Sequence, residues 1–430
     1  MTTTSESAKQ SFKVALVGGG VCGLACAVGL MKAGVDVEVF EAAAHFKEIG
    51  AGIGIGANSL PILKHFGVLD EALAQAHEDR LNMNMFWFIS GKTGELFYEY
   101  PTIESDYGLG LHRAAILDTW IKFVDPKRTH FNKRCTGVSI AADSSSRSVV
   151  HFGDGTTYEA DVVIGADGIK STVRGALNGD VGMHGVVFAR TICYRGLIPR
   201  EKVQAAGVKT DLFSGRPVCY LGDSKHIIVF PVKNSTLINV VAFVADYSKP
   251  IGSDYLPPGE PWVKVVPQEE MIQAYDGWGS DAISLLKCIE EPSKWSVHVL
   301  YPPLDSYVKG RVALLGDAAH AMLPHLGAGA GQGIEDAYVL VELLKHPQTT
   351  TSNIEAVLQA YDRIRRPRAQ MVWNGSYRAG RIYDGAAEHD QSPEGVSEDI
   401  GRMWDPVIHH DVRDQVQSAV DWLKETLVFT

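Results

Sequence analysis

The sequence lacks a long run of consecutive basic residues, and it carries more negative than positive charge. Its 430 residues have a formal net charge of −11. A negatively charged protein without a basic patch repels the phosphates of nucleic acids. This argues against a nucleic-acid partner, although an anionic small molecule would need only one local cation. Internal repeats and low-complexity tracts are also missing.

Cysteine is scarce as well, and its spacing predicts neither a disulfide framework nor a metal site. The six cysteines are spread over the chain, and the one close pair, Cys22 and Cys26, has no second pair to complete a metal site. His320 and His325 lie five residues apart without a third ligand, so no metal is expected there. Free thiols, together with a polar start that lacks a signal peptide, predict a cytoplasmic protein.

Long apolar runs are limited to one stretch near the start. From Val14 to Met31 no residue is charged, which is nominally enough to span a membrane. The three glycines from Gly18 to Gly20 interrupt its beginning and favour a turn between a buried strand and a helix. We therefore expect no membrane span and a strand–turn–helix unit in its place.

That turn carries a phosphate-binding pattern. Gly18, Gly20 and Gly23 form G-x-G-x-x-G after a buried strand, and the next strand ends at Glu41. The first glycine permits the tight turn, the second lets a pyrophosphate approach the backbone, and the third lets helix and strand pack closely. An acidic residue at the end of the second strand can accept hydrogen bonds from a ribose. The pattern predicts dinucleotide binding, with a plain glycine turn as the alternative.

The middle of the chain has a different character. Segments such as 226–232 and 237–245 are rich in β-branched and aromatic residues, which predicts an antiparallel sheet of a separate domain. A short apolar strand and a glycine-rich turn return at residue 311, and residues 354–372 have a helical pattern despite Pro367. The expected fold is α/β: a Rossmann-like domain with an inserted, mostly antiparallel β domain and a C-terminal helical segment. The expected boundaries are 10–178 for the first part of the Rossmann-like domain, 179–300 for the inserted domain, 301–375 for the return segment and 376–430 for the C-terminal segment.

Two further strand ends carry an aspartate. Segment 161–174 places Asp167 after an apolar strand, where it either contacts a ligand or caps the next helix. Segment 316–337 begins with Gly-Asp and continues into a glycine-rich helix start. Asp317 can accept a hydrogen bond from a ribose or ribityl hydroxyl. A helix N-terminus without bulky side chains can approach a negatively charged or electron-rich group.

In this order and at these separations, the three motifs resemble those of the FAD-dependent aromatic hydroxylases of the para-hydroxybenzoate hydroxylase fold, over about residues 12 to 375. The resemblance implies that the first motif holds the ADP part of FAD and that the second lies where FAD and NAD(P)H are both handled. The third would contact the ribityl chain and the flavin ring. The resemblance also implies that Arg113 contacts the cofactor; the alternative is a surface arginine on an amphipathic helix. The implied FAD-binding residues are Gly18, Gly20, Val21, Cys22, Gly23, Glu41, Ala51, Gly52, Arg113, Asp167, Asp317, Pro324, Gly327, Gly329, Ala330 and Gly331.

Within this family, segments 192–199, 225–232 and 317–337 are most similar to salicylate hydroxylases. The similarity implies that NADH or NADPH, bound transiently, reduces FAD and that O₂ then forms a flavin C4a-hydroperoxide, whose electrophilic oxygen adds to a phenolic ring. The expected substrate is a small phenolic aromatic acid. Salicylate would lose CO₂ and give catechol; the alternative is 6-hydroxynicotinate, an orcinol- or resorcinol-type phenol or a polyketide-derived phenol. A monomer or a homodimer is expected.

Three residues are candidates for catalysis. His325 precedes the glycine-rich helix, where a neutral imidazole could accept the phenolic proton; a structural histidine is the alternative. Arg195 is the candidate cation near the substrate, with an exposed or salt-bridged arginine as the alternative, and Tyr220 is a weaker polar candidate. Phe230 occupies a strand position where dearomatising relatives are expected to carry a tyrosine. The alternative from a different class of function is a flavin-binding protein that does not hydroxylate, or a regulatory module.

Overall fold

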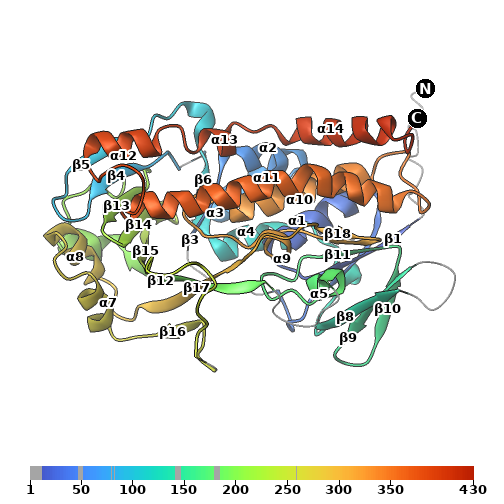
Figure 1. Cartoon of the computed structure of the whole chain (residues 1–430), viewed down its shortest axis with the longest axis horizontal. Coiled ribbons are helices and arrows are strands. Elements are labelled where there is room, and N and C mark those ends of the chain that lie inside the picture. Colours follow the sequence, from blue (N-terminus) through green and yellow to red (C-terminus); the bar gives the residue numbers. More distant parts are fainter. Residues whose placement is uncertain are drawn as a thin grey trace.

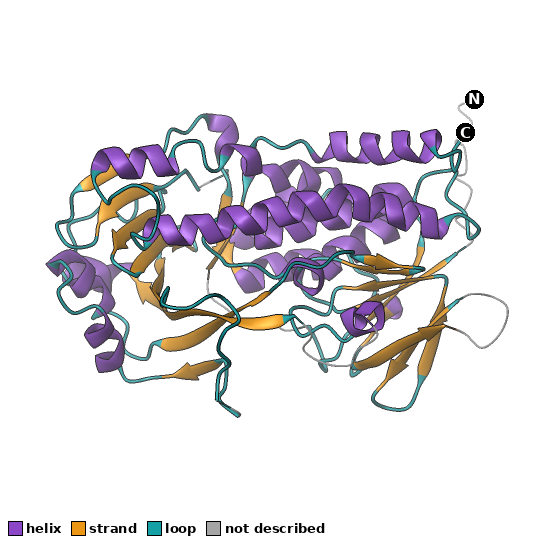
Figure 2. Cartoon of the chain, viewed as in Figure 1, coloured by secondary structure: helices purple, strands orange, loops and turns teal. Residues whose placement is uncertain are grey.

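The computed structural model describes residues 12–46, 52–78, 80–81, 83–140, 147–178, 185–257 and 259–430. Each half of the molecule is built on a sheet, and helices lie across both halves (Figures 1 and 2). The helix α11 (Ile354–Tyr383) runs along both halves and holds Pro367 in its interior (Figure 1). The helical pattern predicted for 354–372 is therefore confirmed, and the helix continues to Tyr383.

A six-stranded sheet carries the three motifs at the ends of its strands. In sheet order its strands are β18 (Val308–Lys309), β19 (Val312–Leu314), β11 (Val162–Gly165), β1 (Lys13–Val17), β2 (Asp36–Phe40) and β7 (Thr129–His130). β19, β11, β1 and β2 run parallel, and the residues of β11 and β19 are all buried, as expected of a sheet covered on both faces. The carboxyl ends of parallel strands share one edge, so three motifs far apart in the sequence meet there.

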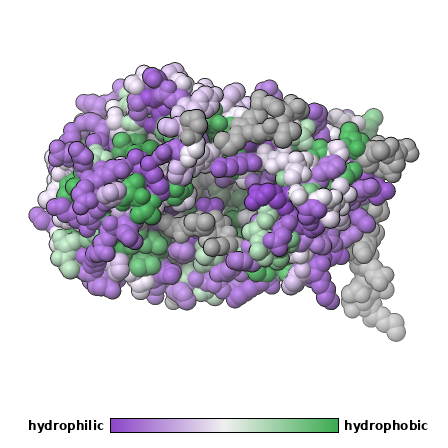
Figure 3. Space-filling model, turned by 90° about the horizontal axis from the view of Figure 1, so that it is seen from below, coloured by the Kyte–Doolittle hydropathy of each residue, from purple (hydrophilic) through white to green (hydrophobic). Residues whose placement is uncertain are grey.

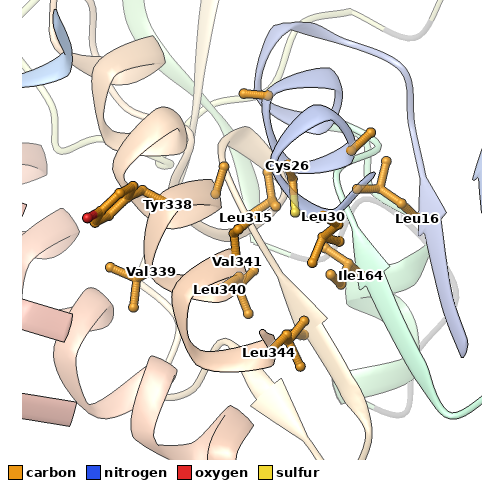
Figure 4. Packing of buried hydrophobic residues seen from close by; sticks show 14 of the residues in the cluster. Leu16, Cys26, Leu30, Ile164, Leu315, Tyr338, Val339, Leu340, Val341 and Leu344 are labelled. Carbon is orange, nitrogen blue, oxygen red and sulfur yellow. The ribbon is translucent and has the colours of Figure 1, made fainter. Parts of the chain in front are cut away.

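The helices α1 (Val21–Lys32) and α10 (Gly329–Leu344) pack together against this sheet. Figure 4 shows Cys26 and Leu30 of α1 beside Val341 of α10 in the main buried cluster. Full burial of a Leu or Val side chain stabilises the fold by about 1.5–3 kcal/mol. The uncharged stretch near the start of the chain is therefore a core strand and a core helix. Among the described residues, no helix combines the length and the apolar character needed to cross a membrane.

The second half is an eight-stranded sheet. In sheet order its strands are β16 (Val263–Val265), β17 (Ser293–Leu300), β12 (Val186–Pro199), β15 (Leu237–Ala245), β14 (Lys225–Val232), β13 (Val218–Gly222), β4 (Trp87–Ser90) and β5 (Leu96–Glu99). Only β13 and β4 pair in parallel, so the predicted antiparallel character is confirmed. β4 and β5 reach this sheet from a part of the chain that precedes the predicted inserted domain. The domain boundaries themselves stay predictions. The helices α7 (Gln268–Ala274) and α8 (Ser280–Leu286) cover one face of the sheet.

The remaining elements are small. Two further sheets pair β3 (Gly52–Ile55) with β6 (Leu109–His112), and β8 (Cys135–Ile140) and β10 (Thr157–Ala160) with β9 (Ser148–Phe152). The C-terminal segment is helical, as predicted. The other helices are α2 (Leu60–His65), α3 (Leu69–Ala76), α4 (Arg113–Ile121), α5 (Val173–Asn178), α6 (Arg200–Ala205), α9 (Asp317–His320), α12 (Pro393–Ile400), α13 (Asp405–Ile408) and α14 (Val412–Glu425), with 3₁₀ turns η1 (Ala57–Ser59), η2 (Glu104–Asp106) and η3 (Pro126–Arg128).

Candidate active site

A cavity of about 470 Å³ lies between the two halves of the molecule. The strand ends of the six-stranded sheet form one side of it, and one face of the eight-stranded sheet forms the other. On the face seen in Figure 3 the surface is hollowed near its middle. Most predicted site residues line this cavity: Gly20, Val21, Cys22, Gly52, Arg113, Arg195, Asp317, Pro324, His325, Gly327, Gly329, Ala330 and Gly331. Ala51 lies outside the described residues.

In the first glycine motif, close packing requires two of the glycines, and the third borders open space. A Cβ on Gly18, whose φ is +108°, would lie 2.4 Å from the carbonyl oxygen of Ala166, and one on Gly23 would lie 2.1 Å from the carbonyl oxygen of Gly18. A Cβ on Gly20 would meet nothing within 4 Å. Gly20 precedes the first residue of α1, and no side chain caps this end of the helix. The N–H groups at the start of α1 therefore face open space, which suits a pyrophosphate.

Substituting Gly20 with valine is expected to abolish most FAD binding without unfolding the protein. The added methyl groups would occupy the space that a pyrophosphate needs, and nothing in the fold opposes them. We expect FAD affinity to fall by at least about tenfold, which corresponds to 1.4 kcal/mol. The flavin absorbance per protein, measured beside far-UV circular dichroism, checks this. Gly137→Val is the control, because a Cβ there also meets nothing within 4 Å but lies in β8, away from the cavity. An unchanged FAD content in Gly20→Val would contradict the assignment.

Two acidic residues predicted to contact the cofactor are engaged by backbone groups. Glu41 accepts hydrogen bonds from the N–H groups of Gly19 and Ala43, both at 2.7 Å, which places its carboxylate beside the glycine turn. Asp167 accepts from the Ser171 hydroxyl at 2.5 Å and from the Thr172 N–H at 2.7 Å. These hydrogen bonds are the ones expected if Asp167 caps the helix that follows it, which is the alternative to contact with a ligand. Its role toward a cofactor, like that of Glu41, stays a prediction.

The third motif shows why the start of α10 is so poor in side chains. Asp317 is exposed in the cavity, directly after Gly316. Along α10, a Cβ on Gly331 would lie 3.0 Å from the Ser59 hydroxyl, and one on Gly333 would lie 2.3 Å from the Cys22 sulfur. A Cβ on Gly327 would meet nothing within 4 Å. Some of these glycines are therefore required by close packing against α1 and η1, whereas others leave space at the cavity.

A buried ionic network fastens this helix start to α11. Asp336 accepts hydrogen bonds from the Gly316 N–H at 3.0 Å, from His320 at 2.6 Å and from Arg365 at 2.8 Å. Burial alone would raise the pKa of Asp336, but His320 and Arg365 lower it to about 2. Glu335 binds Arg365 at 2.7 Å and the cavity residue Asn58 at 2.5 Å. His320 is thus held inside this network by the buried carboxylate of Asp336.

Replacing Arg365 with alanine is expected to destabilise the fold by about 3–5 kcal/mol, because two buried carboxylates would lose their main cation. Urea denaturation followed by tryptophan fluorescence measures this change. Arg402→Ala is the control, since the Arg402 side chain is 88% exposed and pairs with Asp405 at the surface. That control should alter stability little. Equal midpoints for the two variants would show that the buried network contributes no more than a surface pair.

The side of the cavity opposite the strand ends is one face of the eight-stranded sheet. Side chains alternate between the two faces of a strand, so residues two apart point the same way. The cavity-lining residues follow this rule on three neighbouring strands. They are Cys193 and Arg195 on β12, Asn239, Val241 and Phe243 on β15, and Ile228 and Phe230 on β14.

The prediction that Tyr220 lies near the substrate is corrected by the strand register. Arg195 is opposite Val241, Val241 is opposite Ile228, and Ile228 is opposite Cys219. Paired residues point to the same face, so the next residue, Tyr220, points to the other one. There its hydroxyl donates to Asp281 at 3.2 Å, in the cluster under α7 and α8. Burial raises the pKa of Tyr220, which keeps this hydroxyl protonated.

Arg195 and Arg113 give the cavity a positive end. Burial lowers the pKa of Arg195, and the nearby Arg113 lowers it further. The guanidinium of Arg195 lies 5.2 Å from the ring centroid of Trp295, and its Nε is buried without a hydrogen-bond partner in the described part of the chain. A buried cation beside a second cation favours binding of an anion, so this end of the cavity suits a carboxylate.

His325 is buried at the side of the same cavity. Its ring contacts His226 and Phe243, with centroid distances of 5.0 and 5.1 Å. Burial, with a smaller contribution from His226, holds the pKa of His325 well below its ordinary value. A Cβ on Gly380 would lie 2.5 Å from this ring, so a glycine on α11 makes room for it. The lowered pKa keeps the imidazole neutral, so one ring nitrogen carries a lone pair.

Several lining residues carry no sequence signal that would have revealed them. Met83, Met85 and Phe86 precede β4, and Trp404 and Val407 come from the C-terminal segment. They are apolar residues without a motif, brought to the cavity only by long-range packing. Alternation along β12, β14 and β15 could have indicated Asn239 and Phe243, once the face of the sheet was known. Asn239 accepts a hydrogen bond from the Gly52 N–H at 3.0 Å.

Comparisons with known proteins agree with this arrangement. The FAD binding domain family matches residues 11–376. A salicylate hydroxylase of Pseudomonas putida is 38% identical over 425 residues, which cover 96% of this chain and 95% of that protein. A 6-methylsalicylate 1-monooxygenase of Aspergillus terreus is 33% identical over 403 residues, which cover 91% of this chain and 86% of that protein. The solved structure of a salicylate hydroxylase substrate complex superposes with a TM-score of 0.85 at 33% identity, covering 96% of this chain and 98% of that one.

The family match spans both sheets of the molecule. FAD is the cofactor of this family, and reduced nicotinamide dinucleotide and O₂ are the co-substrates of such monooxygenases. The glycine turn, the exposed Asp317 and the open start of α10 supply the space and the hydrogen-bonding groups that FAD requires. The chain therefore belongs to the FAD-dependent aromatic monooxygenases and is of the salicylate hydroxylase type.

Proposed function

We propose that this chain hydroxylates salicylate with loss of CO₂, giving catechol, and uses NADH or NADPH and O₂. The observation that carries the proposal is that one apolar cavity contains two cations and a neutral imidazole, contributed by Arg195, Arg113 and His325. A carboxylate and a phenol are the two groups that such a cavity would recognise. The similarity to salicylate hydroxylases over nearly the whole chain supports the same choice.

Each side chain has a distinct role in this proposal. Arg195 binds the substrate carboxylate through charge-assisted hydrogen bonds and so orients the ring. His325 accepts the phenolic proton, which makes the ring electron-rich enough for attack by an electrophilic oxygen. Val241, Phe243 and Phe230 enclose the ring and exclude water from the reacting carbon.

The strand-end side of the cavity is assigned to FAD. The N–H groups at the start of α1 would hold the pyrophosphate, and Asp317 would accept a hydrogen bond from the ribityl chain. The start of α10 would face the flavin ring, with the positive end of the helix dipole toward it. Bound FAD supplies the redox chemistry, which is storage of the hydride and activation of O₂. Asp167 and Glu41 are proposed to support this site from the strand ends.

A different phenol is the second candidate, and Phe230 bears on it. Its ring lines the cavity, where a tyrosine would offer a hydroxyl to a phenol lacking a carboxylate. Because Phe230 cannot donate a hydrogen bond, it gives no support to orcinol- or resorcinol-type substrates. The two arginines instead favour an acid, which includes 6-hydroxynicotinate as well as salicylate.

Product analysis tests the proposal. The purified holoenzyme is supplied with NADH or NADPH and with salicylate, 6-hydroxynicotinate or orcinol. Oxidation of the nucleotide, release of H₂O₂, and formation of CO₂ and hydroxylated product are measured together. With salicylate we expect catechol and CO₂ in amounts equal to the nucleotide consumed. If salicylate yields only H₂O₂ while another phenol is hydroxylated in full, salicylate is a pseudo-substrate and the proposal fails.

The cellular context is proposed on separate grounds. All six cysteines are free thiols, and five of them are buried. Free thiols are typical of proteins in a reducing compartment, so we place the enzyme in the cytoplasm. A monomer or a homodimer is proposed as its state in solution.

A further inference from the structure

A buried chain of polar side chains lies directly behind His325. His226, on β14, contacts Asp384 at the end of α11, with 2.7 Å between Nδ1 and the carboxylate oxygen Oδ1. Both side chains are fully buried. The hydroxyl of Tyr247 donates to the second oxygen of Asp384, also at 2.7 Å. Tyr247 is half-buried, so the chain of contacts extends from the cavity wall toward the surface.

Each of the two adjacent histidines has one ring nitrogen that makes no hydrogen bond within the described residues. Nε2 of His226 and Nδ1 of His325 are buried, and neither has a hydrogen-bond partner among the residues that the structure describes. Their rings are 5.0 Å apart between centroids and inclined by 67°. Leaving a buried polar atom unpaired typically costs about 1–3 kcal/mol, so two such atoms in adjacent rings require an explanation. The two nitrogens do not bond each other in this structure, and a rotation of the rings that let them share a proton would satisfy both atoms.

The other ionisable groups around this pair keep their protons at neutral pH. Tyr275 donates to the carbonyl oxygen of His226, and Tyr383 donates to that of His325. Burial raises the pKa of both tyrosines, and it raises the pKa of Cys193 and Cys219 on neighbouring strands. At the outer end, burial raises the pKa of Tyr247, whose ring is covered by the Arg381 guanidinium and which also faces Tyr377. The groups left to exchange a proton are the two histidines and Asp384.

We propose that His226 and Asp384 are positioning residues that take over the substrate's phenolic proton from His325. The proton leaves the phenolic oxygen for His325 and then passes to His226, which becomes an imidazolium paired with the Asp384 carboxylate. The substrate remains as the phenolate, and no electron is transferred in this step. Tyr247 holds the second oxygen of Asp384 and fixes the orientation of the carboxylate. The inference rests on the proposed function, since it supplies a destination for the proton that hydroxylation requires to be removed.

The pH profile of Asp384→Asn tests this proposal. Without the carboxylate, the imidazolium loses its counter-charge and the phenol ionises only at higher pH. We expect the rising limb of product formation, measured at saturating salicylate in the holoenzyme, to move up by about one pH unit or more, a tenfold change in the ionisation equilibrium. At high pH the rate should recover toward that of the wild type, because solvent hydroxide then removes the proton.

The control is Asp399→Asn. Asp399 is also buried and also pairs with a histidine ring, His389, at 3.0 Å, but it lies on α12 outside the residues lining the cavity. It should leave the pH profile unchanged. A uniform loss of rate in Asp384→Asn, with the limb in its wild-type position, would show that Asp384 acts only on the fold and would overturn the proposal.

Two further variants keep the test decisive if Asp384→Asn does not fold. His226→Asn retains a donor for Asp384 but has no second ring nitrogen, and Tyr247→Phe removes one hydrogen bond near the surface. His226→Asn should shift the rising limb of the pH profile as far as Asp384→Asn would, and Tyr247→Phe should shift it by less. If neither variant shifts the rising limb, the proposal is contradicted. Failure of the proposed function is a separate result: the wild type would then give no hydroxylated product from salicylate at any pH.

Discussion

Product formation in the His325→Ala variant is expected to fall by about 10²–10⁴-fold, the usual cost of losing a positioned base. The ring must gain phenolate character before an electrophilic oxygen arrives, and the neutral imidazole of His325 is the cavity group placed to accept the proton. Nucleotide oxidation should continue, so reducing equivalents would leave as H₂O₂. FAD content should match that of the wild type, because His325 is assigned to the substrate. Rates of catechol and H₂O₂ formation, measured in the same reaction, report both effects.

A second substitution separates loss of the base from loss of volume. His325→Gln fills much of the same space with a side chain that cannot act as a base, so it should be about as slow as the alanine variant. The control is His389→Ala, since His389 is partly exposed and pairs with Asp399 outside the cavity. Wild-type coupling in His325→Gln would show that His325 is structural and would leave the proton to another group.

Replacing Arg195 with methionine is expected to raise the KM for salicylate by about 30-fold or more. Truncating one partner of a buried, charged hydrogen bond typically costs about 2–5 kcal/mol, and each 1.4 kcal/mol is a factor of ten. Methionine keeps much of the apolar length of the side chain, so the cavity should retain its shape. The turnover number should change less than KM, provided that the ring still reaches His325. Steady-state kinetics of catechol formation over a range of salicylate concentrations measure the two constants.

A phenol without a carboxylate tests whether the charge of Arg195 is the cause of the higher KM. Its binding should be weak in the wild type and nearly the same in Arg195→Met. Arg200→Met is the control, because Arg200 is exposed and lies over Phe213 rather than in the cavity. An equal loss for both ligands would mean that Arg195 shapes the cavity and does not bind the carboxylate.

The strand-end side of the cavity was predictable because its signals are local. A buried strand, a glycine turn and a helix start are neighbours in the sequence, and their side-chain requirements can be read from a few residues. Gly18 and Gly23 are required by contacts within that unit, as the distances to Ala166 and Gly18 show. Parallel strands end at one edge, so the meeting of Gly18, Asp167 and Asp317 also follows from the fold class.

The substrate side depended on tertiary structure. The alternation of side chains along a strand divides residues into two faces, but it does not say which face lines a cavity. Arg195 and the weaker candidate Tyr220 both stayed open until the register placed them on opposite faces and α7 and α8 covered the face of Tyr220.

Long-range packing decided the rest. Asp384 lies far from His226 in the sequence, and α11 brings it into contact with that histidine. Trp404 comes from a segment without a motif and lines the cavity only through long-range packing. The sequence by itself determined the family and the cofactor, because the motifs that carry the resemblance are short groups of neighbouring residues. Only the tertiary structure decided which polar side chains line the cavity, because burial and register depend on elements that are distant along the chain.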